Sequence, residues 1–268
     1  MSLELLGYSA AIVMGLSLGL MGGGGSILTV PMLAYLFGQD AVTATGLSLF
    51  IVGTTSAAGL FSHHRQGNIH WPTAAVFGAS SMASVYAARH WLVPALPDPV
   101  WQGNGFTLSK DTTLLILFAL AMLFSAVRMI RGKAPIPGAH PVKHGTLPLV
   151  AIGLGVGLLT GVLGAGGGFL IVPALVLLAG MDMKHAVGTS LLIITLNSFV
   201  GFMGDTSVQL ADHTTILLPI LALAILGIIL GSRLATRTRN ERLRPAFGWF
   251  ILAMGAFIIV HELYTSAG

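Results

Sequence analysis

Long runs of apolar residues, separated by short polar segments, make up most of the chain. Eight of them have about 18 residues or more, close to the roughly 20 that a helix needs to cross the bilayer core. They cover residues 3–21, 42–62, 71–93, 112–130, 146–163, 184–203, 213–233 and 243–261. Two further runs, at residues 26–37 and 168–179, correspond to only about 18 Å of helix. The pattern therefore predicts an all-α polytopic membrane protein with about eight full transmembrane helices and two short half-helices.

Composition agrees with this pattern and excludes several classes of protein. Of the 268 residues, 54% are hydrophobic and 8% are charged, whereas a soluble domain carries about 25% charged residues. The apolar runs leave no room for a separate catalytic domain, and no G-x-x-x-x-G-K-[ST] nucleotide-binding sequence occurs. The chain has no Cys, and no cluster of nucleophile, base and acid lies within the apolar runs. We therefore expect no enzyme activity, no cofactor and no nucleic-acid partner.

The two halves of the chain resemble each other without a gap. A shift of 142 positions makes about twenty of 45 aligned residues identical, which indicates an internal duplication. The identical pairs include Gly15/Gly157, Gly19/Gly161, Gly22/Gly164, Gly24/Gly166, Gly25/Gly167, Pro31/Pro173, Asp40/Asp182, Gly46/Gly188, Ser48/Ser190 and Ser56/Ser198. We expect a first transmembrane repeat at residues 1–131, a cytoplasmic linker at 132–145 and a second repeat at 146–268.

Basic residues predict the orientation, because Lys and Arg in short loops are retained on the cytoplasmic side. If the loop around Lys133 is cytoplasmic, alternation of the spans leaves only Arg89 and Lys110 on the outer side. The cytoplasmic set is Arg65, Arg128, Arg131, Lys133, Lys143, Lys184, Arg233, Arg237, Arg239, Arg242 and Arg244. Each half then has an odd number of membrane elements, so the halves form an inverted-topology repeat in the cell membrane with both termini non-cytoplasmic.

Consecutive glycines end the first span of each half and precede each half-helix. The breaks are Gly22–Gly25 and Gly164–Gly168. Irregular backbone at membrane depth is tolerated where it is buried in protein or lines a cavity, and the N-terminus of a following helix attracts anions. The alternative is close helix packing, which the four-residue spacing of Gly15, Gly19 and Gly23 also favours.

Polar residues inside the spans are neutral, whereas all nine carboxylates fall at span ends or in loops. We therefore predict that a small anion binds to the breaks and to neighbouring hydroxyl and amide groups. The predicted binding residues are Gly22, Gly23, Gly24, Gly25, Ser26, Ser48, Thr54, Thr55, Gly164, Ala165, Gly166, Gly167, Gly168, Thr189, Ser190 and Asn197. For Asn197, an interhelical hydrogen bond is the alternative to lining the cavity.

Other polar clusters have simpler interpretations. His63 and His64 are expected to be polar anchors at the membrane interface, and no metal site is predicted. The basic residues at 233–244 are expected to fix the topology and to contact anionic lipid of the bilayer, with collection of substrate as the alternative.

The doubled motif G-x-x-x-G-x-x-G-x-G-G-x-x-L-x-V-P occupies Gly15–Pro31 and Gly157–Pro173, and each copy precedes a G-x-S element at 46–48 and 188–190. With these motifs the chain resembles the TauE/SafE sulfite exporter family, also called TSUP, from residue 3 to about residue 263. The resemblance implies a bacterial or archaeal inner-membrane transporter of small sulfur-containing anions such as sulfite or organosulfonates. An anion channel, or an uptake permease coupled to protons, is the alternative. The copies differ where Ser26 faces Gly168 and Gly23 faces Ala165, which suggests asymmetric halves of one site.

Overall fold

The structure is a computed structural model that describes residues 2–103, 106–131, 146–164, 166–177, 179–235 and 240–266. The predicted linker at 132–145 lies outside these ranges. The elements of the first half are α1 (Ser2–Met21), the 3₁₀ helix η1 (Gly23–Leu28), α2 (Thr29–Pro31), the π-helix η2 (Met32–Leu36), α3 (Ala41–Arg65), α4 (Trp71–Ala87), the π-helix η3 (Ala88–Leu92), α5 (Val93–Ala95), β1 (Trp101–Gly103), β2 (Phe106–Leu108) and α6 (Lys110–Arg131). Those of the second half are α7 (Thr146–Leu163), α8 (Gly168–Leu177), α9 (Met183–Gly204), the 3₁₀ helix η4 (Leu210–His213), α10 (Thr214–Ala235) and α11 (Asn240–Ser266).

Helices dominate the described part of the chain, as the apolar runs predicted. Six of the described helices are long and apolar enough to cross a membrane, namely α1, α3, α6, α7, α9 and α10. The predicted run at 71–93 is helical throughout, because α4 continues into η3 and α5, and α11 covers the last run. The count of eight crossing helices stays a prediction. A small hairpin was not predicted: β1 pairs with β2 antiparallel, with Trp101 opposite Leu108.

The two half-helices are present as short helical segments after the glycine breaks. The first extends through η1, α2 and η2, and the second is α8. The first segment turns back along α1, because a Cβ on Gly7 of α1 would lie 2.5 Å from the ring of Phe37 at the segment's end. The rings of Tyr8 and Phe37 also meet edge to face, with centroids 5.4 Å apart. The first half therefore begins with a helical hairpin.

Equivalent aspartates begin α3 in the first half and α9 in the second. The backbone N–H of Thr43 donates to Oδ1 of Asp40 at 2.9 Å at the start of α3. At the start of α9, the N–H groups of Lys184 and His185 donate to Oδ1 of Asp182 at 3.1 and 3.2 Å. A side-chain oxygen at the N-cap satisfies backbone donors that have no partner within the helix. The duplicated sequence thus produces the same local structure twice.

Glycines bring α1 into close contact with α10 of the other half. A Cβ on Gly15 would lie 2.1 Å from the carbonyl oxygen of Ala224, and one on Gly19 would lie 2.5 Å from that of Ile228. Contacts therefore advance along both helices in the same direction, so α1 and α10 run parallel. Small residues at four-residue spacing allow this close approach.

The corresponding contact joins α7 to α4. A Cβ on Gly157 would lie 2.4 Å from the carbonyl oxygen of Ser81, and one on Gly161 would lie 2.9 Å from that of Val85. These two helices also run parallel. In each case, the first helix of one half packs against a helix of the other half.

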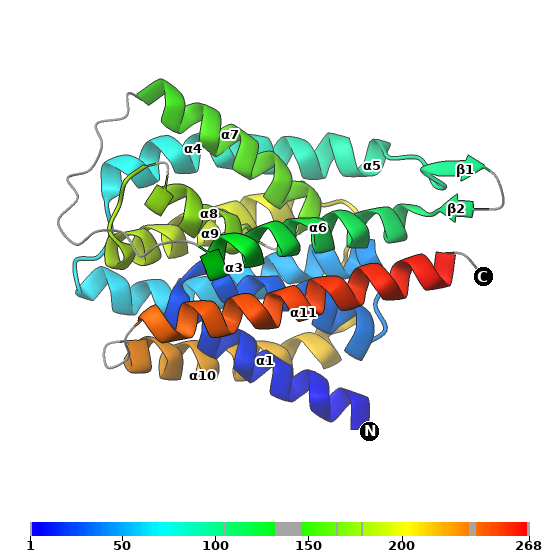
Figure 1. Cartoon of the computed structure of the whole chain (residues 1–268), viewed down its shortest axis with the longest axis horizontal. Helices are drawn as coiled ribbons and strands as arrows, with labels where there is room; N and C mark the ends of the chain where they lie inside the picture. The colour runs from blue at the N-terminus through cyan, green and yellow to red at the C-terminus, as the bar shows by residue number, and fades with distance from the viewer. Residues whose placement is uncertain are drawn as a thin grey trace.

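At the centre, α3 and α9 cross in opposite directions. A Cβ on Gly53 would lie 3.1 Å from the Cβ of Ser198, whereas one on Gly201 would lie 3.3 Å from a side-chain carbon of Leu49. The helices α6 and α11 pack against each other at the periphery (Figure 1). Figure 1 also shows both ends of the chain at one end of the bundle, opposite the end where α3, α6 and α10 finish.

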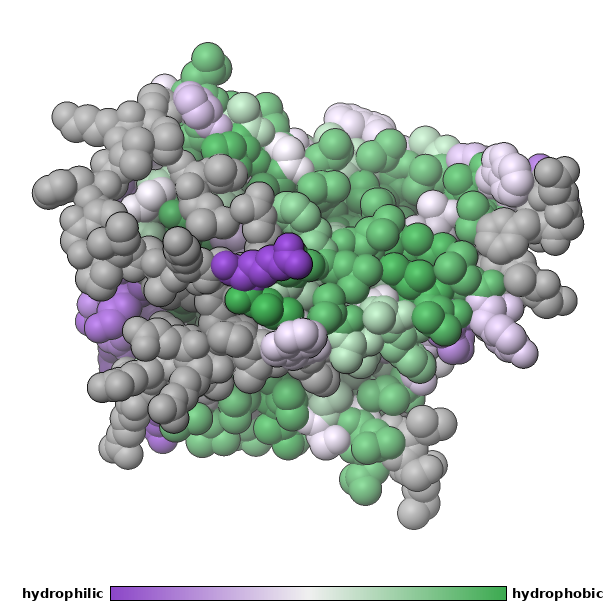
Figure 2. Space-filling view, in the orientation of Figure 1, coloured by the Kyte–Doolittle hydropathy of each residue, from purple (hydrophilic) through white to green (hydrophobic). Residues whose placement is uncertain are grey.

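The outer surface is apolar across the middle of the bundle. Figure 2 shows hydrophobic residues over the broad middle of the visible face and hydrophilic residues mainly near its two ends. Large exposed apolar side chains occur along several helices, among them Leu120 and Phe124 of α6, Leu154 of α7, Leu226 of α10 and Phe257 of α11. An apolar surface of this extent matches the hydrocarbon core of a bilayer.

Candidate functional site

The first glycine break, Gly22–Gly25, follows α1 and is buried, and its last three residues form the start of η1. Gly22 has a φ of +73°, a left-handed conformation that residues with a Cβ rarely adopt. A Cβ at this position would lie 3.0 Å from Oγ of Ser190 and 3.1 Å from Cγ1 of Val187. The break therefore lies directly against the first two turns of α9, and the space between them is too narrow for a side chain on Gly22.

The second break lies against both central helices. Positive φ values occur at Gly164 (67°), Gly166 (62°) and Gly167 (76°). A Cβ on Gly166 would lie 2.5 Å from Oγ of Ser198 in α9 and 2.6 Å from Cγ1 of Val52 in α3. The predicted site residue Ala165 lies outside the described residues. Sharp backbone turns and the close approach of two helices thus account for these glycines.

The two breaks contact each other. A Cβ on Gly23 would lie 2.0 Å from backbone atoms of Gly168, and a Cβ on Gly168 would lie 2.2 Å from Cα of Gly23. Two backbones can approach this closely only when neither residue has a side chain. The start of η1 and the start of α8 therefore meet in the interior of the bundle.

Four serines lie on the central helices beside these breaks. Ser48 and Ser56 of α3 and Ser190 and Ser198 of α9 are all completely buried. Residues eight apart lie on one face of a helix, so each helix carries two of them on one face. The hydroxyl of Ser190 donates to the carbonyl of Val187 at 2.8 Å. Within the described part of the chain, the other three hydroxyls have no hydrogen-bond partner.

Asn197 makes the interhelical hydrogen bond that was the alternative interpretation of its role. Its Oδ1 accepts a hydrogen bond of 3.0 Å from the hydroxyl of Ser81, which joins α9 to α4. Its Nδ2 is buried and has no partner among the described residues. A buried donor without a partner costs about 1–3 kcal/mol. Asn197 and the three serine hydroxyls could thus donate hydrogen bonds to a bound anion.

Thr55, Thr189 and Ser26 already have structural partners. Thr55 donates to the carbonyl of Ile51 at 2.7 Å, and Ser26 donates to that of Gly23 at 2.8 Å. The hydroxyl oxygen of Thr189 accepts a 2.9 Å hydrogen bond from the backbone N–H of His70. These groups therefore order the helices around the breaks.

Thr54 differs from the other predicted residues, because it is only half-buried on α3. Its neighbour Thr55 is completely buried. Adjacent positions on a helix do not face the same way, so Thr54 and Thr55 cannot both face one small ligand.

Three buried polar side chains near the breaks, those of Ser56, Ser198 and Arg89, were not among the binding residues predicted from the sequence. Ser56 and Ser198 were recognised as polar residues within spans, and their equivalence under the repeat was the available signal. Arg89, counted among the charges outside the membrane, lies instead in η3 and is only 2% exposed. Its Nη1 is 3.1 Å from Oδ2 of Asp205. A charge near the end of an apolar run is thus part of the protein interior.

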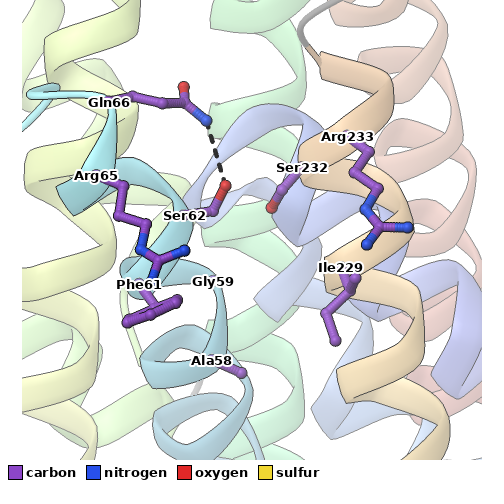
Figure 3. Close-up of a pocket in the computed structure, with 9 residues that line it drawn as sticks. All are labelled: Ala58, Gly59, Phe61, Ser62, Arg65, Gln66, Ile229, Ser232 and Arg233. Carbon is purple, nitrogen blue, oxygen red and sulfur yellow. Dashed lines mark hydrogen bonds between the residues drawn. The ribbon is translucent and has the colours of Figure 1, made fainter.

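A cavity of about 440 Å³ opens between the ends of α3 and α10. Ser62 and Ser232 lie on its two walls, and the guanidinium groups of Arg65 and Arg233 lie on opposite sides of it (Figure 3). The guanidinium carbon of Arg65 lies 4.3 Å from the centre of the Phe61 ring. This cationic cavity, which we call the vestibule, is at the end of the bundle where α3 and α10 finish, opposite the two chain termini (Figure 1).

The chain is similar to membrane proteins from bacteria and archaea. A probable membrane transporter protein from Xylella fastidiosa strain 9a5c is 32% identical over 255 residues, which cover 92% of this chain and 91% of that protein. One from Methanocaldococcus jannaschii is 25% identical over 93% of this chain and 94% of its own length. The probable membrane transporter protein YdhB of Bacillus subtilis is 26% identical over 82% of this chain and 86% of its own length.

No solved structure matches the chain significantly. The family described as sulfite exporter TauE/SafE matches residues 8–258, which is nearly the whole chain. The doubled glycine motif and both breaks fall within this range. The chain therefore belongs to the TauE/SafE sulfite exporter family.

Proposed function

We propose that this protein is an integral membrane transporter that exports small sulfur-containing anions, with sulfite and short organosulfonates as the substrate class. One observation carries the proposal: the two buried glycine breaks meet in the interior, beside serine and asparagine donors that have no partner in the described part of the chain. Donors fixed in a low-dielectric interior favour a bound anion. The family supports the substrate class, and the relatives that are probable membrane transporter proteins support transport rather than enzyme activity.

The arrangement of the helices supports an inverted repeat in which each half supplies one break. Under the shift of 142 positions, α1 corresponds to α7 and α3 corresponds to α9. The pair α1 and α10 has its counterpart in α7 and α4, and the equivalent helices α3 and α9 run in opposite directions. Transporters with inverted repeats move one repeat against the other around a central site, which exposes that site to each side in turn.

The distribution of charge supports both termini being outside the cytoplasm. Arg65 ends α3 and Arg233 lies in the last turn of α10, and both helices finish at the end of the bundle opposite the chain termini (Figure 1). If that end is cytoplasmic, as the bias of basic residues indicates, the vestibule faces the cytoplasm. An anion would then enter from a cationic cavity on the side from which export begins.

The charges within the protein point to the energy source for export. The buried pair of Arg89 and Asp205 is neutral as a whole, so a bound anion adds net negative charge to the interior. A potential that is negative inside drives such a charge outward with about 2.3 kcal/mol per charge per 100 mV. At roughly 150 mV a dianion gains about 7 kcal/mol, so export needs no coupled ion.

Flux from proteoliposomes tests this function. Purified protein would be reconstituted with sulfite, sulfoacetate, taurine, sulfate or thiosulfate inside, and the potential would be clamped with a potassium gradient and valinomycin. We expect saturable efflux of sulfite or sulfoacetate that accelerates as the interior becomes negative. Efflux that follows a pH gradient and ignores the potential would replace this mechanism with proton coupling. Flux that neither saturates nor supports counter-transport would identify an anion channel.

A further inference from the structure

Arg89 holds a charge in the interior of the protein at the second glycine break. The residue lies in η3, directly after α4, and is 2% exposed. Its Nη1 contacts Oδ2 of Asp205 at 3.1 Å. The carboxylate of Asp205 also accepts hydrogen bonds from the backbone N–H and the hydroxyl of Ser207. Asp205 therefore fixes one end of the guanidinium, and Ser207 fixes Asp205.

The rest of the guanidinium has no hydrogen-bond partner among the residues that the structure describes. Nε and Nη2 of Arg89 are buried and make no hydrogen bond to any described residue. These two nitrogens share one edge of the planar group, and such an edge matches two oxygens of a sulfonate, sulfite or carboxylate. Packing alone would not select a buried arginine whose bidentate edge is unsatisfied.

This free edge lies beside the second break. A Cβ on Gly164 would lie 2.2 Å from Nη2 of Arg89 and 2.3 Å from Cβ of Thr45. On α3, Thr45 contacts Gly164 and Val52 contacts Gly166. Ser48 lies between Thr45 and Val52 at helical spacing, so it belongs to the same face of α3, and its buried hydroxyl has no partner within the described ranges.

The cation at position 89 has no counterpart at the equivalent position of the other half. The close contact of Gly161 with Ala88 of η3 corresponds to the contact of Gly19 with Gly231 and Ser232 of α10. The position equivalent to Arg89 is thus occupied by a small neutral residue. A charge that only supported the packing of the fold would be expected in both halves, because the same helices pack there twice.

We propose that Arg89 is a substrate-binding residue, held by Asp205 so that its Nε and Nη2 bind two oxygens of the transported anion at the second break, next to Ser48. This assignment rests on the proposed function and specifies its binding site. It also gives the site a preference for anions with two equivalent oxygens over spherical anions such as chloride, because the two donors are fixed in one plane.

The test separates a binding role from a structural ion pair. The double variant Arg89→Gln/Asp205→Asn removes both charges and keeps side chains that can form a hydrogen bond, so the fold is preserved without a buried unpaired charge. We expect it to reconstitute like the wild type and to bind labelled sulfite at least about 100-fold more weakly. Arg89→Lys keeps the charge and removes the fork, and we expect it to lose at least about 10-fold in affinity. Lys110→Gln, at the same end of the bundle, is the matched control and should bind sulfite as the wild type does.

The outcomes distinguish a failure of the binding role of Arg89 from a failure of the proposed transport function. If the wild type transports sulfite and the double variant transports it with unchanged KM, Arg89 does not bind substrate and the proposed function stands. If the double variant is misfolded, Arg89→Lys decides, since sulfite affinity at wild-type strength in that variant contradicts the binding role. If the wild type neither binds nor moves sulfite or sulfoacetate, the proposed function fails, and the assignment of Arg89 fails with it.

Discussion

The contact between the two glycine breaks gives a strong prediction about stability and transport. A Cβ placed on Gly23 would lie 2.0 Å from backbone atoms of Gly168, whereas carbon atoms in contact are normally about 3.5–4.0 Å apart. The two backbones would have to separate by about 1.5 Å. Neither chain can yield by turning a side chain, because the clash is with main-chain atoms.

Gly23→Ala should therefore destabilise the protein by about 1–3 kcal/mol, the usual range for overpacking a well-filled interior. For a domain of this size, each kcal/mol corresponds to about 2–4 °C in Tm. The folded fraction of detergent-solubilised protein, followed by size-exclusion chromatography after heating, would measure the shift. Sulfite efflux from proteoliposomes should fall in parallel, because the breaks would no longer meet at the same distance.

A control variant and a double variant test whether the contact between the two breaks causes the loss of stability. Gly155→Ala, in α7, introduces a Cβ with nothing within 4 Å, and should leave Tm equal or higher, since Ala favours a helix by about 1 kcal/mol over Gly. Gly23→Ala/Gly168→Ala should cost less than the sum of its single variants, because one separation relieves both clashes. An unchanged Tm and unchanged efflux in Gly23→Ala would show that the breaks do not touch.

Three further predictions concern orientation, the vestibule and the central donors. A cysteine at Ser266 should react with an impermeant thiol reagent on intact cells, and a cysteine at Lys133 should not; the opposite pattern would reverse the proposed topology. Arg65→Gln and Arg233→Gln should each raise the apparent KM for efflux a few-fold at low salt, with a smaller effect at high ionic strength because salt screens the cations. Ser198→Ala should weaken sulfite binding about 5- to 10-fold in a binding titration while Tm stays equal or rises, because it removes a buried donor that has no partner.

Much of the helical architecture could be predicted from the sequence because each signal was local. Long apolar runs fix where helices lie, since a backbone inside a bilayer must satisfy its own hydrogen bonds. Asp40 and Asp182 mark the beginnings of α3 and α9, as short polar side chains at an N-cap do. The duplication in the sequence also pairs the two breaks with each other and the serines of α3 with those of α9.

The packing of helices across the two halves could not be predicted in the same way. Transmembrane helices are similarly apolar on many faces, so hydropathy alone does not select their partners. The four-residue spacing of Gly15 and Gly19 indicated a close contact, but nothing local indicated that α10 would be the partner. The π-helical turns in η2 and η3 were not predicted either, although Pro31 directly precedes η2 and Pro94 closely follows η3, and a proline removes one helical hydrogen bond.

The burial of Arg89 follows from a register that only the fold provides. Helix α4 and its continuation η3 run beside α9, and two hydrogen bonds join residues that are 116 positions apart: Ser81 with Asn197, and Arg89 with Asp205. Halfway between these pairs, a Cβ on Gly201 would lie 2.7 Å from the side chain of Val85, again 116 positions away. One parallel register therefore places the neutral pair and the ion pair two turns apart on the same interface.

Both pairs leave nitrogen donors without a partner among the described residues. The hydroxyl of Ser81 donates to Oδ1 of Asn197, and Nδ2 of Asn197 has no partner there. Asp205 likewise accepts from Nη1 of Arg89, and Nε and Nη2 of Arg89 have no partner there. Since the same interface orients both sets of unused donors, a substitution that shifts the register of α4 on α9, such as Gly201→Leu, should weaken sulfite binding more than either Asn197→Ala or Arg89→Lys alone.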